Sequence, residues 1–201
     1  MIRIILIIAL ILLLFIFHEE DGKMVHSGKM GDLSFRMMAA IHDNRLRRVL
    51  DNPTRSLKSA GIQPGQHVLE VGCGPGFFTI AAAKLVGDEG RVYAIDLQPL
   101  AIETTRKKLH EAGVTNVELR IADAAQTGLP SESIDLVFLF GVVHALPLDT
   151  VLPELYRILK PGGSIAVRSF HGWAEKLTLG GFFTSEGKNG GVYNFRKVVA
   201  M

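Results

Sequence analysis

The sequence predicts a doubly wound α/β fold, in which a mostly parallel sheet lies between layers of helices. From residue 63 onward, short apolar runs typical of strands alternate with segments of helical periodicity. One of these runs, Ile134–Phe140, is almost wholly apolar, as expected for a central strand of a parallel sheet that is buried on both faces. Right-handed crossovers between such strands would place helices on both faces of the sheet.

The elements follow one another in a regular order. The expected parallel strands are His67–Val71, Arg91–Ile95, Asn116–Ile121, Ile134–Phe140 and Ser164–Ser169. The expected helices between them are Gly76–Val86, Pro99–Ala112 and Leu148–Leu159. Gly113 follows the second helix and Lys160-Pro161-Gly162-Gly163 follows the third, and both are signals that end a helix.

The C-terminal part has a different pattern. Phe182–Ser185 and Val192–Phe195 are short β runs on either side of a segment rich in Gly and Asn, residues 186–191. Such residues tolerate the positive φ of tight turns, so we predict an antiparallel hairpin. The hairpin brings the sheet to seven strands.

Two helices are expected before the first strand. Leu33–Leu50 has an interrupted apolar face and is broken by Asp51-Asn52-Pro53. A short helix, Thr54–Ala60, then ends at Gly61. We therefore divide this part into N-terminal helices at residues 32–62 and an α/β domain at residues 63–201. The first helix can either pack as core or cover an acceptor pocket as a lid, in which case these side chains would face it: Met37, Met38, Ile41, His42 and Asp43.

The first 17 residues are strongly hydrophobic, and a polar linker at residues 18–31 follows them. Ile4–Phe17 is an unbroken apolar run that would span about 21 Å as a helix, against a hydrocarbon core of roughly 30 Å. We expect residues 2–17 to form a membrane anchor, counted here as a transmembrane helix of marginal length. A cleaved signal peptide and a buried core helix are the alternatives, although no small-residue cleavage site follows Phe17 and the run has no polar stripe.

The basic residues near this run favour one orientation. Lys23, Lys29 and Arg36 follow it, whereas Arg3 and the amino terminus precede it. The excess of Lys and Arg after the run favours a membrane-associated protein whose catalytic domain faces the cytoplasm.

Composition limits the classes of partner. The formal net charge is +2, with no basic stripe, so nothing indicates a nucleic-acid partner. Cys73 is the only cysteine, which excludes an intrachain disulfide and makes structural zinc improbable. The histidine spacing indicates no metal site, and we expect none.

A glycine-rich loop follows the first strand, in the segment Glu70-Val71-Gly72-Cys73-Gly74-Pro75-Gly76. Glycine lets the backbone turn sharply and approach a ligand, and ligands of open α/β sheets bind beyond the carboxyl ends of the strands. Asp96 ends the second strand, where a carboxylate suits the hydroxyls of an adenosine ribose. A dinucleotide loop would be G-x-G-x-x-G, but its third glycine would fall at Phe77, which disfavours that class.

With these residues in order, the sequence resembles the class I S-adenosylmethionine-dependent methyltransferases, in particular their small-molecule and quinone-modifying branch. The resemblance covers roughly residues 63–197 and gives the expected sheet its family name, the Rossmann-like methyltransferase fold. Five motifs carry it in order: Val68–Gly76, Tyr93–Asp96, Ala122–Ala124 with Leu129-Pro130, Ser133–Val137 and Leu155–Gly163.

The resemblance implies a role for each matching residue. The loop residues Gly72, Cys73, Gly74 and Gly76 would line the methionine part of S-adenosylmethionine, and Glu70 would order them. Asp96 would hold the ribose hydroxyls, with Leu97 against the adenine. Asp123 and Ala124 would bind the adenine amino edge, although Asp123 could instead cap a turn. Phe140 and Gly141, which end the fourth strand, would border the transferable methyl.

His144 is the candidate catalytic residue. It follows the fourth strand, where relatives often carry histidine, and a neutral imidazole can take a proton from an attacking atom. Packing is the alternative role, because methyl transfer can proceed by positioning alone. His171, after the fifth strand, is a weaker candidate.

We therefore expect in-line transfer of a methyl group from S-adenosylmethionine to a small, apolar acceptor. A dinucleotide-dependent oxidoreductase and a non-catalytic cofactor-binding protein are the alternative functions, since the fold supports both.

Overall fold

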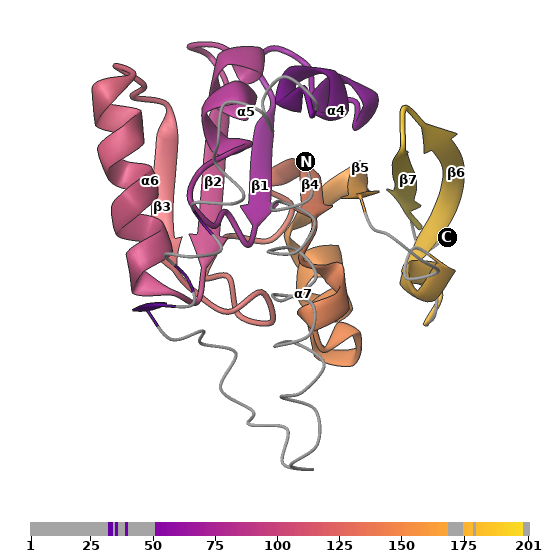
Figure 1. The fold of residues 1–201 in the computed structure, drawn as a ribbon. Coiled ribbons are helices and arrows are strands. Elements are labelled where there is room, and N and C mark those ends of the chain that lie inside the picture. The colour runs from indigo at the N-terminus through magenta and orange to yellow at the C-terminus, as the bar shows by residue number, and fades with distance from the viewer. Residues whose placement is uncertain are drawn as a thin grey trace, which may run out of the picture.

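The computed structural model describes residues 32, 33, 35, 39, 51–168, 175–178 and 180–198. Its centre is a seven-stranded sheet in the order β3-β2-β1-β4-β5-β7-β6 (Figure 1). The first five strands are parallel, and β7 runs antiparallel to both of its neighbours. The strands are β1 (His67–Val71), β2 (Arg91–Asp96), β3 (Val117–Ile121), β4 (Ile134–Phe140), β5 (Leu159–Arg168), β6 (Phe183–Asn189) and β7 (Val192–Lys197).

Helices cover both faces of the sheet. One face packs against α4 (Pro53–Ser59), α5 (Thr79–Val86) and α6 (Pro99–Glu111). The other packs against α7 (Leu148–Ile158) and the short 3₁₀ helix η2 (Glu175–Thr178). A second 3₁₀ helix, η1 (Val143–Ala145), follows β4.

Strand β4 separates two hydrophobic cores. Leu136 and Phe138 point to the face of α4 and α5, whereas Val137 and Leu139 point to the face of α7. All four side chains are almost completely inaccessible to solvent. This explains why the segment is continuously apolar rather than alternating. The predicted doubly wound fold with a C-terminal hairpin is confirmed.

Three element boundaries differ from the prediction. Helix α5 begins at Thr79 and not at Gly76, because Gly76 has a φ of 78° that no helix allows. Strand β5 begins at Leu159, and its register with β4 shifts across the Lys160–Gly163 turn, which the sequence signals placed outside the strand. The hairpin strands are longer than predicted, since its turn contains only Gly190 and Gly191, both with positive φ.

Several predicted features lie outside the described residues. They are the hydrophobic segment at residues 1–17, the linker at 18–31, most of the possible lid (including Met37, Met38, Ile41, His42 and Asp43) and His171. In the part of the chain that the structure describes, no helix has the length and apolarity needed to cross a membrane.

Candidate cofactor site

The loop after β1 is held against the end of β2 by backbone hydrogen bonds. The N–H groups of Gly72 and Cys73 both donate to the carbonyl oxygen of Ile95, at 2.8 and 3.1 Å. The next N–H, that of Gly74, donates to Oδ2 of Asp96 at 2.9 Å. The loop at residues 72–76 together with Asp96 is called the cradle below. It lies beside the boundary between β1 and β4, where the strand order reverses and where ligands of such sheets bind.

The three glycines of the cradle have different physical reasons to be glycine. A Cβ on Gly72 would lie 2.8 Å from Cγ2 of Val142, and a Cβ on Gly76 would lie 2.9 Å from Oγ1 of Thr105. These two positions are therefore required for close packing. A Cβ on Gly74 would meet no atom within 4 Å, although its φ of 51° also favours glycine. Gly74 thus presents open space at the centre of the loop, as a site for a ligand requires.

Asp96 is half-buried at the end of β2, and each of its carboxylate oxygens accepts one backbone hydrogen bond. Gly74 donates to Oδ2 and Gln98 donates to Oδ1, both at 2.9 Å. Burial raises the pKa of this carboxyl above its usual value, while the backbone N–H groups of Gln98, Gly74 and Leu97 oppose the rise. Asp96 is not the N-cap of α6, because Gln98 occupies that position.

Glu70 lies beneath the cradle and not on its surface. Its side chain is buried, and Oε2 accepts a hydrogen bond of 2.6 Å from the hydroxyl of Thr79, the first residue of α5. Burial raises its pKa from 4.5 to about 8; the Thr79 bond lowers it, and the charge of Asp96 raises it further. Glu70 therefore joins β1 to α5 across the loop as a mostly protonated acid at neutral pH.

Cys73 is also buried. Burial raises the pKa of its thiol well above the usual value, and the charges of Glu70 and Asp96 add to the rise. A thiol of this kind stays protonated, so Cys73 fills space in the loop and does not act as a nucleophile.

The loop after β3 carries the predicted adenine-binding pair. Asp123 is exposed, and its Oδ1 accepts a hydrogen bond of 2.8 Å from the N–H of Ala125, so it does cap a turn. Its Oδ2 has no partner among the described residues. Ala124 is buried beneath the loop, where it joins the core on the α7 face.

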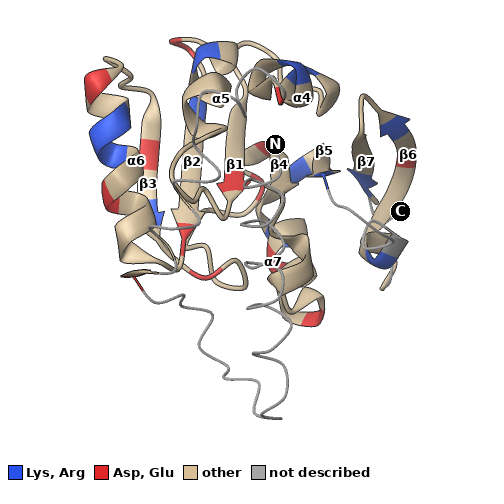
Figure 2. Cartoon of the chain, in the orientation of Figure 1, with Lys and Arg blue, Asp and Glu red and all other residues tan. Residues whose placement is uncertain are grey.

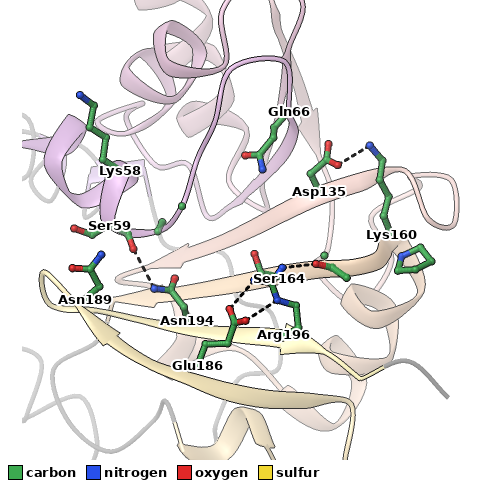
Figure 3. A pocket seen from close by; sticks show the side chains of 15 residues that line it. Lys58, Ser59, Gln66, Asp135, Lys160, Ser164, Glu186, Asn189, Asn194 and Arg196 are labelled. Carbon is green, nitrogen blue, oxygen red and sulfur yellow. Dashed lines mark hydrogen bonds and ion pairs between the residues drawn. The ribbon is translucent and has the colours of Figure 1, made fainter. Parts of the chain in front are cut away.

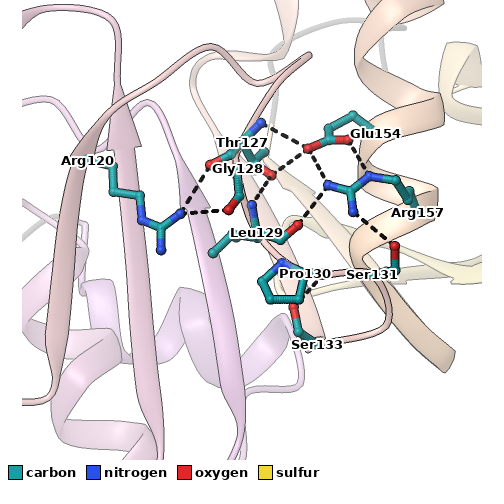
Figure 4. Close-up of polar contacts among 9 residues, drawn as sticks. All are labelled: Arg120, Thr127, Gly128, Leu129, Pro130, Ser131, Ser133, Glu154 and Arg157. Carbon is teal, nitrogen blue, oxygen red and sulfur yellow. Dashed lines mark hydrogen bonds and ion pairs between the residues drawn. The ribbon is translucent and has the colours of Figure 1, made fainter.

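A polar network joins this same loop to α7 and β3 (Figure 4). Oε1 of Glu154 on α7 accepts hydrogen bonds from the N–H and the hydroxyl of Thr127, at 2.9 and 2.6 Å. Arg157 pairs with Glu154 and also donates to the carbonyl oxygen of Leu129. From the other side, Arg120 donates to the carbonyl of Gly128 at 3.0 Å. These contacts hold the loop next to the end of β2.

The end of β4 borders open space on the α4 face. Phe140 packs edge-to-face on Phe78, with ring centroids 5.0 Å apart. A Cβ on Gly141, whose φ is 80°, would meet no atom within 4 Å. His144 follows in η1 and is exposed. Of the histidines in the described ranges, His67 begins β1 and His110 ends α6, so His144 is the one at the carboxyl edge of the sheet.

Acidic residues lie at the carboxyl ends of β1 and β2 (Figure 2), and they are Glu70 and Asp96.

A cavity of about 580 Å³ lies at the opposite edge of the sheet, between α4, the start of β5 and the hairpin (Figure 3). Four of its five charged side chains form ion pairs, Lys160 with Asp135 and Arg196 with Glu186, and the fifth is Lys58. Asp135 also accepts a hydrogen bond from the N–H of His67, so its role is structural. We therefore do not place the cofactor in this cavity.

The described residues contain no group of three or more His, Cys, Asp or Glu side chains that could hold a metal ion.

Sequence reasoning missed three residues that shape the cradle: Thr79, Thr105 and Val142. Only Thr79 had a usable signal, because it follows the glycine loop at the start of the helix. Thr105 and Val142 are distant in sequence, and their contacts depend on how α6 and the loop after β4 pack.

Residues 68–163 match a family model described as a methyltransferase domain. They contain the cradle, the loop after β3 and the end of β4. Two curated relatives are the ubiquinone/menaquinone biosynthesis C-methyltransferase of Pseudoalteromonas translucida and the demethylmenaquinone methyltransferase of a Geobacillus species. The first is 35% identical over 118 residues, which are 58% of this chain and 47% of the relative. The second is 34% identical over 120 residues, 59% of this chain and 51% of the relative.

The chain thus spans about half the length of these curated relatives. Among solved structures, an S-adenosylmethionine-dependent methyltransferase from Aquifex aeolicus superposes with a TM-score of 0.68 at 24% identity. The superposition covers 85% of this chain and all of that one. The fold is therefore the Rossmann-like methyltransferase fold.

Proposed function

We propose that the chain is an S-adenosylmethionine-dependent methyltransferase that acts on a small, apolar acceptor by in-line methyl transfer. The observation that carries the proposal is the link between Asp96 and Gly74, which sets a ribose-binding carboxylate beside a loop that faces open space. The match of residues 68–163 to a methyltransferase domain supports the same conclusion.

The residues of the cradle fit this cofactor. Each Asp96 oxygen accepts one backbone hydrogen bond, so each retains a lone pair for one ribose hydroxyl. Gly74 lets the methionine part approach the backbone, because among the described residues no atom lies within 4 Å of where its Cβ would be. Leu97 is partly exposed next to Asp96 and is available to the adenine, whose amino edge Asp123 and Ala124 would bind.

The end of β4 would serve the methyl group. S-adenosylmethionine supplies a sulfonium methyl: the acceptor atom bonds to the methyl carbon while the carbon–sulfur bond breaks, and the electron pair stays on sulfur. Phe140 and Gly141 border this position and exclude water on one side. His144, which lies in η1 after β4, would accept the proton that the acceptor loses.

The acceptor is proposed from the relatives. Two of them are named for ubiquinone, menaquinone or demethylmenaquinone, which are quinones. The ring of a quinone becomes aromatic when the quinone is reduced. Phe140 is partly exposed and packs edge-to-face on the buried ring of Phe78, so it offers an aromatic surface for such a ring. A small aromatic compound of the reduced quinone type is therefore the acceptor class to test first.

The lid at residues 32–50 and the membrane anchor at residues 2–17 remain proposals. The lid is supported by its two described flanks: Asp32 accepts a hydrogen bond from Gln98 after β2, and Asp51 pairs with Arg168 at the end of β5. The anchor is supported by the apolar sequence Ile4–Phe17, and a cytoplasmic orientation by the Lys and Arg that follow it.

The experiment is a methyl-transfer assay with the purified protein. It uses S-adenosylmethionine labelled in the methyl group and a reduced naphthoquinone without a ring methyl. We expect labelled product with wild type and loss of most of it with Asp96→Ala. Tight binding of the cofactor with no transfer to any member of a broad acceptor panel would favour a non-catalytic binding protein instead.

A further inference from the structure

Arg168 is the last residue of β5, and it lies on the acceptor side of the proposed site. It is paired in the sheet with Phe140, and the N–H of Gly141 donates to its carbonyl oxygen at 3.0 Å. Ala166, two residues earlier, joins the core on the α4 face, so the Arg168 side chain projects from that same face. A guanidinium thus stands next to the residues that border the methyl position.

The guanidinium is held along one edge only. Its Nη1 pairs with Oδ1 of Asp51 and donates to the hydroxyl of Ser56 at 3.1 Å. Both partners belong to α4 or to the turn before it. Within the described part of the chain, Nε and Nη2 have no partner, and about a third of the side chain, 32%, is exposed. A positioned arginine with free donors is suited to bind an oxyanion.

We propose that Arg168 binds an ionised oxygen of the methyl acceptor, which makes the acceptor an amphipathic molecule with an apolar body and one weakly acidic hydroxyl, such as a phenol. The apolar body would lie against Phe140, and the hydroxyl would bind as its conjugate base after losing its proton to solvent. This inference rests on the proposed methyltransferase function and names a substrate-binding residue that the sequence motifs do not contain.

The charges around Arg168 are compatible with such a ligand. From the α4 side, Asp51 is the carboxylate in contact with it, and Arg55 and Lys58 add positive charge to the same helix. From the β4 side, the loop that follows the strand carries His144 in η1. Asp51 compensates one charge, so an anionic ligand would compete with it for the guanidinium.

Because Asp51 and the acceptor would compete for Arg168, variants of the two residues distinguish acceptor binding by Arg168 from a purely structural role. If Arg168 only tethers α4 to the sheet, Arg168→Gln and Asp51→Asn should both lower stability, because both remove the Arg168–Asp51 ion pair, and the two should not differ in the direction of their effect on anion binding. If Arg168 binds the acceptor, Arg168→Gln should weaken anion binding, whereas Asp51→Asn should preserve or strengthen it. Arg196→Gln is the matched control, since it breaks an Arg–Glu pair at the opposite edge of the molecule.

The test uses a phenol whose conjugate base absorbs visible light, 4-nitro-1-naphthol, titrated into the full-length protein saturated with S-adenosylhomocysteine. With wild type we expect the pH at which the bound phenol ionises to fall by about one unit or more. Arg168→Gln should abolish this shift and weaken binding about tenfold or more. Arg168→Lys should keep part of the shift, and Arg196→Gln should match wild type.

Two controls keep the outcomes distinct. The methyl ether of the same compound cannot ionise, so Arg168→Gln should leave its affinity unchanged. If S-adenosylhomocysteine does not bind wild type, the proposed function fails. If it binds but the phenol does not, or ionises identically in wild type and Arg168→Gln, the inference about Arg168 is overturned while the proposed function stands.

Discussion

The backbone N–H of Gly74 donates to Oδ2 of Asp96 across a gap of 22 positions in the sequence, at 2.9 Å. Together with the hydrogen bonds from Gly72 and Cys73 to Ile95, it joins the loop after β1 to the end of β2. It fixes the carboxylate and the loop relative to each other before any ligand arrives, and such preorganisation reduces the entropy that binding must overcome.

Asp96→Asn should weaken binding of S-adenosylmethionine by about 10- to 150-fold, because hydrogen bonds to a charged group contribute about 1.5–3 kcal/mol. Isothermal titration calorimetry gives the affinity directly. Asp88→Asn changes an exposed aspartate at the opposite edge of the sheet and should bind as wild type does. Equal affinities in wild type and Asp96→Asn would show that this carboxylate does not hold the cofactor.

Alanine at Gly72 should mainly lower stability, whereas alanine at Gly74 should mainly lower the affinity for S-adenosylmethionine. Gly72→Ala sets a Cβ 2.8 Å from Val142, so thermal unfolding should show a large loss of stability, about 2 kcal/mol or more. Gly74→Ala adds a methyl that meets no protein atom, so it should cost only about 1 kcal/mol from backbone strain. Its affinity for S-adenosylmethionine should nevertheless fall at least tenfold. A Gly74→Ala protein that binds normally would contradict the placement of the ligand.

Glu70 should make stability depend on pH. Its pKa is about 8 in the folded protein and near 4.5 when unfolded, so the folded state binds the extra proton between these values. The contribution of Glu70 to the free energy of unfolding is therefore full below pH 4.5. It falls by about 1.4 kcal/mol per pH unit as the pH rises toward 8.

Glu70→Gln removes this dependence, since glutamine cannot ionise. Denaturant unfolding at a series of pH values should show the variant gaining stability relative to wild type from pH 5 to pH 8. Parallel curves for the two proteins over this range would mean that Glu70 titrates normally.

Glu154→Ala should loosen the loop after β3. The carboxylate of Glu154 accepts the two hydrogen bonds that Thr127 donates to it, and it pairs with Arg157. The hydrogen bonds from Arg157 lower the pKa of Glu154. We expect a loss of about 1–3 kcal/mol in stability. Faster amide hydrogen exchange at residues 123–129 should accompany it. Glu103→Ala, at an exposed site on α6, should leave exchange in this loop as it is in wild type.

His144→Ala should lower kcat by about 100-fold or more if the imidazole accepts the proton in the rate-limiting step. Added imidazole should then restore part of the rate, and the affinity for S-adenosylmethionine should stay unchanged. His110→Ala changes another exposed histidine, far from the site, and serves as the control. An unaltered kcat in His144→Ala would assign the transfer to positioning alone.

Much of the fold was predictable because local patterns determine it. The apolar run of β4 and the alternation of strands and helices gave a seven-stranded sheet with a hairpin, as observed. The cradle was predictable for a related reason. Gly72, Gly74 and Gly76 lie in one short loop after β1, and Asp96 ends the next strand. The topology alone therefore brings them together.

The remaining features depend on contacts between distant segments. Arg168 and Asp51 are 117 positions apart, and Thr127 and Glu154 are 27 apart. No short sequence pattern indicates such pairs, because they depend on strand register and on helix packing. The early start of β5 was missed for a similar reason: Pro161 and the two glycines after it read as a turn, yet β4 pairs with Leu159 before them.

The central claim is that the cradle of Gly74 and Asp96 binds S-adenosylmethionine. The most direct test is a pair of calorimetric titrations of the purified protein, one with S-adenosylmethionine and one with NAD. We predict saturable binding of S-adenosylmethionine at one site per chain and no measurable heat with NAD. Binding of NAD without binding of S-adenosylmethionine would contradict the account and favour a dinucleotide-dependent oxidoreductase.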